Sequence, residues 1–74
     1  MTYLVIEASN NGSATAKAVH EHREETEARM HFHQVMASAM ANANVKWAYS
    51  EVVTEYGTVI ESERYEKVTE SLVD

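Results

Sequence analysis

One segment in the middle of this 74-residue chain has the hydrophobic period of a helix, while both of its flanks have the character of strands. From about Glu24 onward the apolar residues follow the i, i+3, i+4 spacing of one helix face. These residues are Ala28, Phe32, Val35, Met36, Ala39, Met40 and Ala43. The flanks are rich in β-branched and aromatic residues instead. The sequence therefore predicts one helix between two sets of strands.

Turn signals divide each flank into two strands. The stretch TYLVIEAS predicts a strand, and Asn10–Gly12 predicts a turn because Asn and Gly tolerate positive φ. Residues 14–21 then return as a second strand. A helix from Ser13 is the alternative, because alanine and lysine are poor strand formers. Gly57, between residues 45–56 and 58–67, predicts a β-hairpin that turns at residues 55–58.

The predicted order is β-β-α-β-β in a single domain of residues 1–74. This is an α+β fold with one four-stranded antiparallel sheet and a single helix packed on one of its faces. The stretch Asn42–Asn44 is expected to end the helix, with Asn44 able to take a left-handed cap conformation. The tail, residues 68–74, is expected to be frayed or to form a short helical turn.

Strand alternation divides the sheet residues between a core face and an opposite face. With Phe32, Met36 and Met40 directed at the sheet, close packing requires small or medium side chains opposite them. The residues assigned to the core are Leu4, Ile6, Ala8, Ala48, Ser50, Val52, Ile60 and Ser62. The alternative is that Trp47 and Tyr49 face the helix and that the alanine face points outward.

The opposite face is predicted to be a binding surface, because it is too apolar and aromatic to be ordinary solvated surface. Its predicted interface residues are Tyr3, Val5, Trp47, Tyr49, Glu51, Val53, Glu61, Glu63 and Tyr65. Glu7 and Val59 fall on the same predicted face. A homodimer is the favoured use of this face, since two-fold dimers are the commonest oligomers. A protein partner from a host cell is the second use.

All four histidines lie in residues 20–33, as the pairs His20/His22 and His31/His33. On a strand His20 and His22 point the same way, about 7 Å apart. On a helix His31 and His33 diverge, so at most one of them can join the first pair. Because these periods do not imply the convergence that zinc requires, no metal site and no cofactor are predicted. The histidines are interpreted as boundary residues with mild pH sensitivity.

Composition excludes several classes of function. The chain has no cysteine, which removes thiol catalysis and thiolate zinc sites. It has neither a Gly-rich phosphate loop nor a Gly-X-Ser-X-Gly elbow, so no enzyme is predicted. Twelve acids against six bases give a net charge of −6, which disfavours direct nucleic-acid binding. With no signal peptide and no apolar run of the ~20 residues that a span needs, a cytoplasmic protein away from the membrane is expected.

Three segments together resemble a group of short proteins encoded by phages and prophages of gut Firmicutes. The segments are the YLVIE strand at residues 3–7, the helix residues Ala28, His33, Ala37 and Ala39, and the G-x-V-I-x-S-E-x-Y hairpin at residues 57–65. Trp47 and the His-X-His pairs are not part of the shared pattern. The resemblance implies a phage accessory protein with no catalytic residues to carry over.

Such proteins often block host machinery. The leading hypothesis is therefore a non-enzymatic binding protein that inhibits a host anti-phage defence protein by surface occlusion, in the manner of an anti-CRISPR protein. The first alternative is a sponge that sequesters a nucleotide defence signal on tyrosines, Trp47 and either His20 or His22. The second is a purely structural phage dimer.

Overall fold

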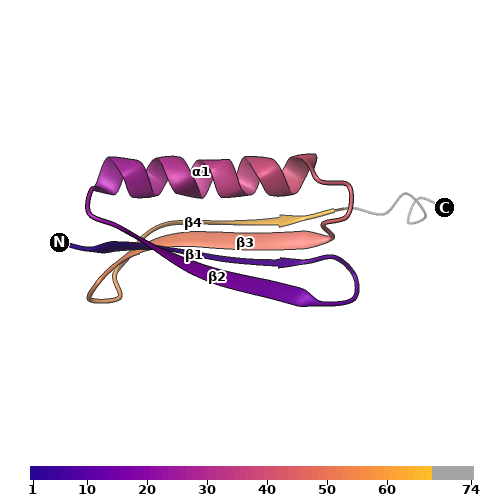
Figure 1. The fold of residues 1–74 in the computed structure, drawn as a ribbon, viewed down its shortest axis with the longest axis horizontal. Coiled ribbons are helices and arrows are strands. Elements are labelled where there is room, and N and C mark those ends of the chain that lie inside the picture. Colours follow the sequence, from indigo (N-terminus) through magenta and orange to yellow (C-terminus); the bar gives the residue numbers. More distant parts are fainter. Residues whose placement is uncertain (68–74) are drawn as a thin grey trace.

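The computed structural model describes residues 1–67, and these form one four-stranded sheet with one helix against it. The elements are β1 (Tyr3–Asn10), β2 (Thr15–His22), α1 (Glu25–Ala41), β3 (Trp47–Thr54) and β4 (Val59–Glu66) (Figure 1). The predicted β-β-α-β-β order is confirmed. The prediction for the tail, residues 68–74, lies outside the described residues.

Glycine with positive φ closes both hairpins. Gly12 has φ 98° and its backbone N–H donates to Asn10 Oδ1 at 2.7 Å, so β1 turns back into β2. Gly57 has φ 90°, and its N–H donates to the Thr54 carbonyl oxygen at 2.9 Å. Both predicted turns are confirmed, and residues 15–22 are a strand rather than the alternative helix.

The helix begins and ends where the change of period predicts, but without the predicted cap. Glu25 and Glu27 in its first turn face the positive end of the helix dipole. The C-cap is Asn42, with φ −93°, and no described residue other than glycine has positive φ. The left-handed cap predicted at Asn44 is therefore wrong. Within residues 1–67, no helix is long and apolar enough to cross a bilayer.

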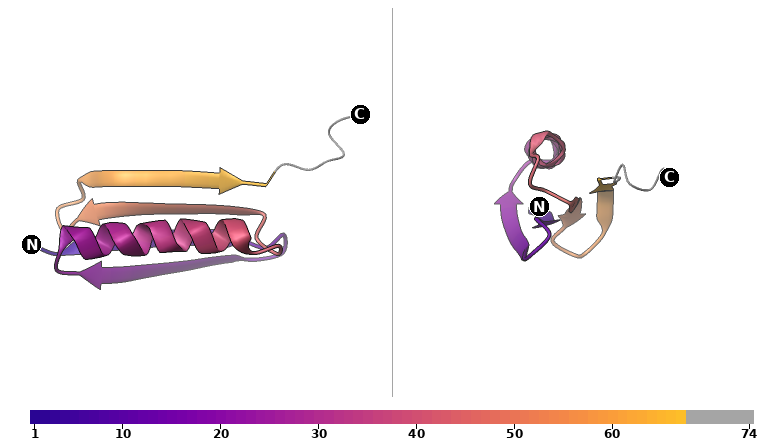
Figure 2. Two further views of the ribbon diagram at one scale, coloured as in Figure 1. Left: turned by 90° about the horizontal axis from the view of Figure 1, so that it is seen from above. Right: turned by 90° about the vertical axis from the view of Figure 1, so that its right-hand side faces the viewer.

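The strands are arranged in the order β2-β1-β3-β4, and every neighbouring pair is antiparallel. Figure 2 shows the helix above one face of the sheet, with no other described element on the opposite face. Phe32, Val5 and Val52, each 0 % exposed, form the centre of the core. Val5 and Val52 are direct cross-strand partners, so β1 and β3 place them side by side under the helix.

The core assignment is correct on β3, wrong on β1, and correct for only one of its two residues on β4. Ala48, Ser50 and Val52 are buried as predicted. On β1 the helix contacts the alternate set, Tyr3 and Val5, so the predicted core role of Leu4, Ile6 and Ala8 is wrong. Because each of the two alternate sets of this central strand contains large apolar residues, alternation alone did not identify the buried one.

On β4 the cause of the error is an irregularity of one residue. Val53 pairs with Val59, whereas Val52 pairs with Glu61, so a register shift lies between Val52 and Val53. Near the turn the predicted assignment of residues to faces is correct, and Ile60 packs against the core. Beyond the shift every side chain changes face. Tyr65 therefore packs on the core and Ser62 is exposed, opposite to the prediction.

Met40 is also misplaced by the prediction. It is 48 % exposed, whereas Ala39 beside it is 8 % exposed and faces the sheet. The helix therefore approaches the sheet through small residues toward its C-terminal end. This leaves space between α1 and the sheet that a bulky methionine would have filled.

Candidate functional site

Three histidines and one glutamate meet between the sheet and the N-terminal half of the helix. Glu7 comes from β1, His20 and His22 from β2, and His31 from α1. These four residues, here called the histidine cluster, are all partly buried. The prediction that only one of His31 and His33 can join the first pair agrees with this arrangement: His31 joins, and His33 lies outside.

The register of the sheet explains why the β2 histidines reach the helix. His20 pairs with Val5 and His22 pairs with Tyr3, and cross-strand partners share a face. Val5 is in the core under the helix, so both histidines point toward α1. Glu7 is two residues beyond Val5 on β1 and therefore points to the same side.

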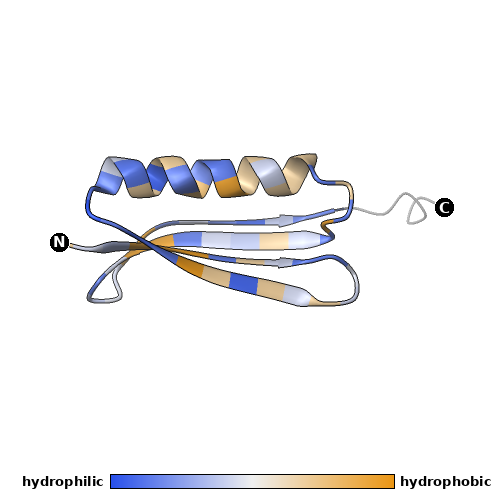
Figure 3. Cartoon of the chain, in the orientation of Figure 1, coloured by the Kyte–Doolittle hydropathy of each residue, from blue (hydrophilic) through white to orange (hydrophobic). Residues whose placement is uncertain are grey.

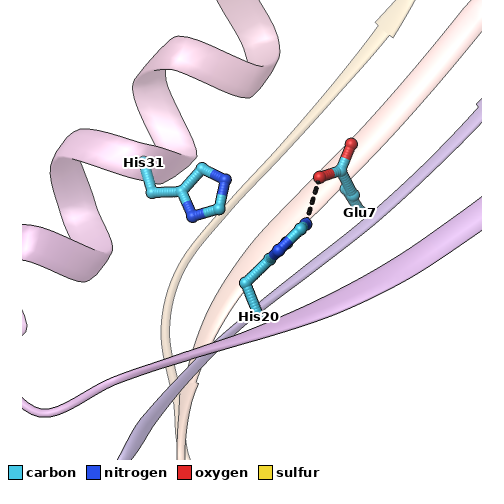
Figure 4. A group of neighbouring side chains, drawn as sticks. All are labelled: Glu7, His20 and His31. Carbon is cyan, nitrogen blue, oxygen red and sulfur yellow. Dashed lines mark hydrogen bonds and ion pairs between the residues drawn. The ribbon is translucent and has the colours of Figure 1, made fainter.

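Close polar contacts connect the cluster. His20 Nε2 lies 2.7 Å from Glu7 Oε2, as Figure 4 shows. His22 Nε2 lies 2.8 Å from His31 Nδ1. The imidazole rings of His20 and His31 have their centroids 4.4 Å apart, and those of His22 and His31 are 5.0 Å apart. Each ring thus touches at least one other member of the cluster.

The environment of His31 favours its neutral form. Partial burial lowers the pKa of His31 below its ordinary value of 6.5, and the neighbouring charges of His20 and His22 lower it further. Glu7 acts in the opposite direction but contributes less. The neutral imidazole is the form that keeps a nitrogen lone pair.

Two hollows give solvent access to the cluster. A groove of about 380 Å³ runs between α1 and β1, and Glu7 and His31 belong to its lining. A second hollow of about 450 Å³ lies on the other side of His31, where His22, Glu27 and Met30 contribute. Among residues 1–67, no lysine or arginine lines either hollow.

His33 points to a different part of the surface. Its Nε2 lies 3.8 Å from Glu61 Oε2 on β4. Arg29, one helical turn before it, donates from Nε to Glu25 Oε2 at 2.9 Å and from Nη1 to Glu61 Oε1 at 2.7 Å. The carboxylate of Glu61 is therefore part of a surface ion pair that joins α1 to β4.

The second candidate site is the face of the sheet opposite the helix, here called the open face. The strand registers assign to it Thr15, Lys17, Val19, Glu21, Leu4, Ile6, Ala8, Asn10, Trp47, Tyr49, Glu51, Val53, Val59, Ser62, Arg64 and Glu66. Five aliphatic side chains, here called the aliphatic band, extend across all four strands at one end of this face. They are Val19, Ile6, Leu4, Val53 and Val59.

The aliphatic band is only partly covered by its own neighbours. Val53 is 6 % exposed, whereas Val19 is 60 % and Val59 is 53 % exposed. Figure 3 colours part of β2 orange, the hydrophobic end of its scale. At the other end of the face, Tyr49 donates its hydroxyl hydrogen to Glu51. That hydrogen bond, together with desolvation, raises the pKa of Tyr49 above its usual value.

The nine predicted interface residues are divided between the two faces. Trp47, Tyr49, Glu51 and Val53 lie on the open face, as predicted. The helix face instead carries Tyr3, Val5, Glu61, Glu63 and Tyr65, so the prediction that all nine form one surface is wrong. Sequence reasoning also missed the open-face positions of Leu4 and Ile6, and the participation of Glu7 in the histidine cluster.

The chain was compared with protein-family models, curated proteins and solved structures, and none of the three comparisons gave a match.

Proposed function

We propose that this protein is a non-enzymatic binding protein that pairs with a second copy through its open face. The observation that carries the proposal is the aliphatic band, whose outer members, Val19 and Val59, are more than half exposed. Two such bands stacked face to face would remove these side chains from water. At about 25 cal/mol per Å² of apolar surface, that burial favours association.

The charge on the open face also supports a second copy as the partner. This face carries two bases, Lys17 and Arg64, and three acids, Glu21, Glu51 and Glu66, so its net charge is −1. Residues 1–67 carry ten acids and six bases, so −3 of their net charge of −4 lies outside this face. Two acidic chains therefore repel each other only weakly across this face.

The oligomeric state tests the proposal directly. We expect sedimentation or light scattering to show a dimer that dissociates on dilution. Val19→Lys and Val59→Lys should shift it to the monomer, because both side chains are exposed in the single chain and a lysine there disturbs only the interface. The matched control is Ala37→Lys on the exposed side of α1, which should remain dimeric. A wild type that stays monomeric at high concentration would contradict the proposal.

The wider role follows from the resemblance to phage accessory proteins. We propose that the dimer acts in the cytoplasm of a host cell and inhibits an anti-phage defence protein by occluding its surface. The acidic groups outside the open face, among them Glu24, Glu27 and Glu63, suit a partner with a basic surface, such as a protein that itself binds nucleic acid.

A phage plating assay tests this role. Expression of the protein in a host with an active defence system should restore plating. Charge reversal at Glu27 and Glu63 should abolish the restoration without changing the oligomeric state. Full restoration by the charge-reversed variant would refute occlusion through the acidic surface.

One observation favours the alternative of a nucleotide sponge. Trp47 and Arg64 line a hollow of about 310 Å³ on the open face, together with Glu66. An indole for stacking and a guanidinium for a phosphate are a combination that nucleotide sites use. Calorimetry with cyclic dinucleotides distinguishes the two functions. A nucleotide sponge should give heat of binding, and the Trp47→Ala variant should give none.

A further inference from the structure

We propose that Glu7, His20 and His31 bind one divalent transition-metal ion, with Zn²⁺ as the best match to their donor atoms. This differs from the expectation drawn from the sequence, which did not place these three residues together. The site lies on the helix side of the sheet, so it is separate from the open face and does not rest on the proposed function.

The distances between the donor atoms carry the proposal. Glu7, His20 and His31 each offer one ligand atom, and these atoms all lie within 4.8 Å of one another. Tetrahedral zinc with bonds of about 2.0–2.1 Å holds its ligand atoms about 3.3 Å apart. Small side-chain rotations therefore bring the three atoms to coordination distance. Each residue is held on a regular element, β1, β2 or α1, which fixes the backbone from which its ligand atom projects (Figure 4).

His22 is suited to orient His31 rather than to coordinate the metal itself. Its Nε2 lies 2.8 Å from His31 Nδ1, which fits a hydrogen bond donated by the His31 Nδ1–H. That tautomer places the lone pair of His31 on Nε2, the other ring nitrogen. A hydrogen bond to the far nitrogen of a ligating histidine is the usual way in which proteins fix the ring and its tautomer.

The donor set selects the class of metal. Two imidazoles and one carboxylate suit Zn²⁺ and the neighbouring late transition metals. Ca²⁺ and Mg²⁺ prefer sites made of oxygen atoms only. The groove and the second hollow both reach His31, so an ion can enter from solvent, and a water molecule has room to occupy the fourth coordination position.

The test begins with the full chain after dialysis against a chelator. Titration with ZnCl₂ in a calorimeter should show one ion per chain, and native mass spectrometry should confirm the stoichiometry. We expect Zn²⁺ in hundredfold excess over its dissociation constant to raise the melting temperature by more than about 5 °C.

Single substitutions identify the ligands. Glu7→Gln, His20→Gln and His31→Gln should each weaken Zn²⁺ binding by at least about tenfold. The matched control is His33→Gln, which removes a histidine of the same helix from outside the cluster and should leave the affinity unchanged. His22→Gln should weaken binding by about 10- to 100-fold, the range for groups that orient a ligand. With Co²⁺ in place of Zn²⁺, the His22→Gln variant should keep the tetrahedral absorption spectrum.

Nitrogen NMR of the wild-type imidazoles gives a readout that needs no variant. Addition of Zn²⁺ should shift the Nε2 resonances of His20 and His31 and leave those of His33 in place. Absence of binding heat would overturn the proposal. So would a loss of affinity in His33→Gln equal to that in His31→Gln, because binding by any surface histidine would then explain the result.

Discussion

Substitution of two adjacent residues of β1 tests which face of that strand the helix covers. Val5 is 0 % exposed and lies in the core, whereas Leu4 points to the open face and is only partly buried. Val5→Ala removes two methyl groups, which account for about 1.6 kcal/mol at about 0.8 kcal/mol each. The unfilled cavity raises the expected loss to about 2–3 kcal/mol. Leu4→Ala removes more carbon but should cost less than about 1 kcal/mol, because its site is partly solvated.

These losses are large in relation to the total stability. A domain of 74 residues is expected to have a free energy of unfolding of about 4–11 kcal/mol. Urea unfolding followed by circular dichroism measures both variants. If m is about 1 kcal/mol/M, Val5→Ala should lower the midpoint by about 2 M or more, and Leu4→Ala by less than about 1 M.

Protein concentration separates core packing from self-association. At low concentration, a loss for Leu4→Ala that equals or exceeds the loss for Val5→Ala would refute the assignment of faces. In a dimer built on the open face, the loss for Leu4→Ala should grow with concentration, because association stabilises the folded chain by mass action. The loss of unfolding free energy caused by Val5→Ala should not depend on protein concentration, because Val5 is buried within the single chain.

Three further predictions concern single groups. Ser50, 0 % exposed, donates its hydroxyl hydrogen to the Ile6 carbonyl oxygen at 2.9 Å, so Ser50→Ala should cost about 1 kcal/mol in chemical denaturation. Gly57→Ala meets no atom within 4 Å of the added Cβ but must adopt φ 90°, so it should cost about 1–2 kcal/mol, and Gly57→Asn should cost less. Because the pKa of Tyr49 is raised in the folded state, its contribution to stability is complete below pH 10 and is lost as the pH rises through the folded-state pKa. Absorbance titration should therefore show Tyr49 ionising above its usual pH, and Glu51→Gln should abolish this delay.

The order of elements could be predicted because each depends on local signals. Asn10–Gly12 and Gly57 mark turns by their backbone freedom, and the alanine-rich segment after Glu24 has a helical period. Even β2, with its poor strand formers, is held as a strand by pairing with β1 along its whole length. Tertiary pairing overrides local propensity there.

The faces of the strands could not be predicted, because they depend on packing between distant residues. On β1 each alternate set contains large apolar residues, and packing against Phe32 decides that Val5 is the buried one. On β4 the shift between Val52 and Val53 moves every later residue to the other face. A hairpin whose strands both alternate contains no signal for such a shift.

The histidine cluster contains one feature that the sequence predicted and one that it did not. The prediction that His20 and His22 share one face of a strand depends only on period 2, and the structure agrees with it. That Glu7 lies beside them follows from the choice of face on β1, which the sequence did not decide. The wrong choice of the buried face of β1 therefore misplaced both Glu7 and Val5, since the two residues are on the same side of this strand.

The central strand β1 connects the two candidate sites. Successive side chains point to opposite faces, so Val5 is buried under the helix, Ile6 is in the aliphatic band and Glu7 is in the histidine cluster. His20 and His22 lie near the C-terminal end of the edge strand β2, where this strand approaches α1. The exposed segment Thr15–Lys17 forms the other end of the strand. An ion held by Glu7, His20 and His31 would therefore fasten this edge strand to the helix. Because Val19 lies between His20 and Ala18 on β2 and belongs to the aliphatic band, the same fastening would also hold one edge of the proposed dimer surface in place.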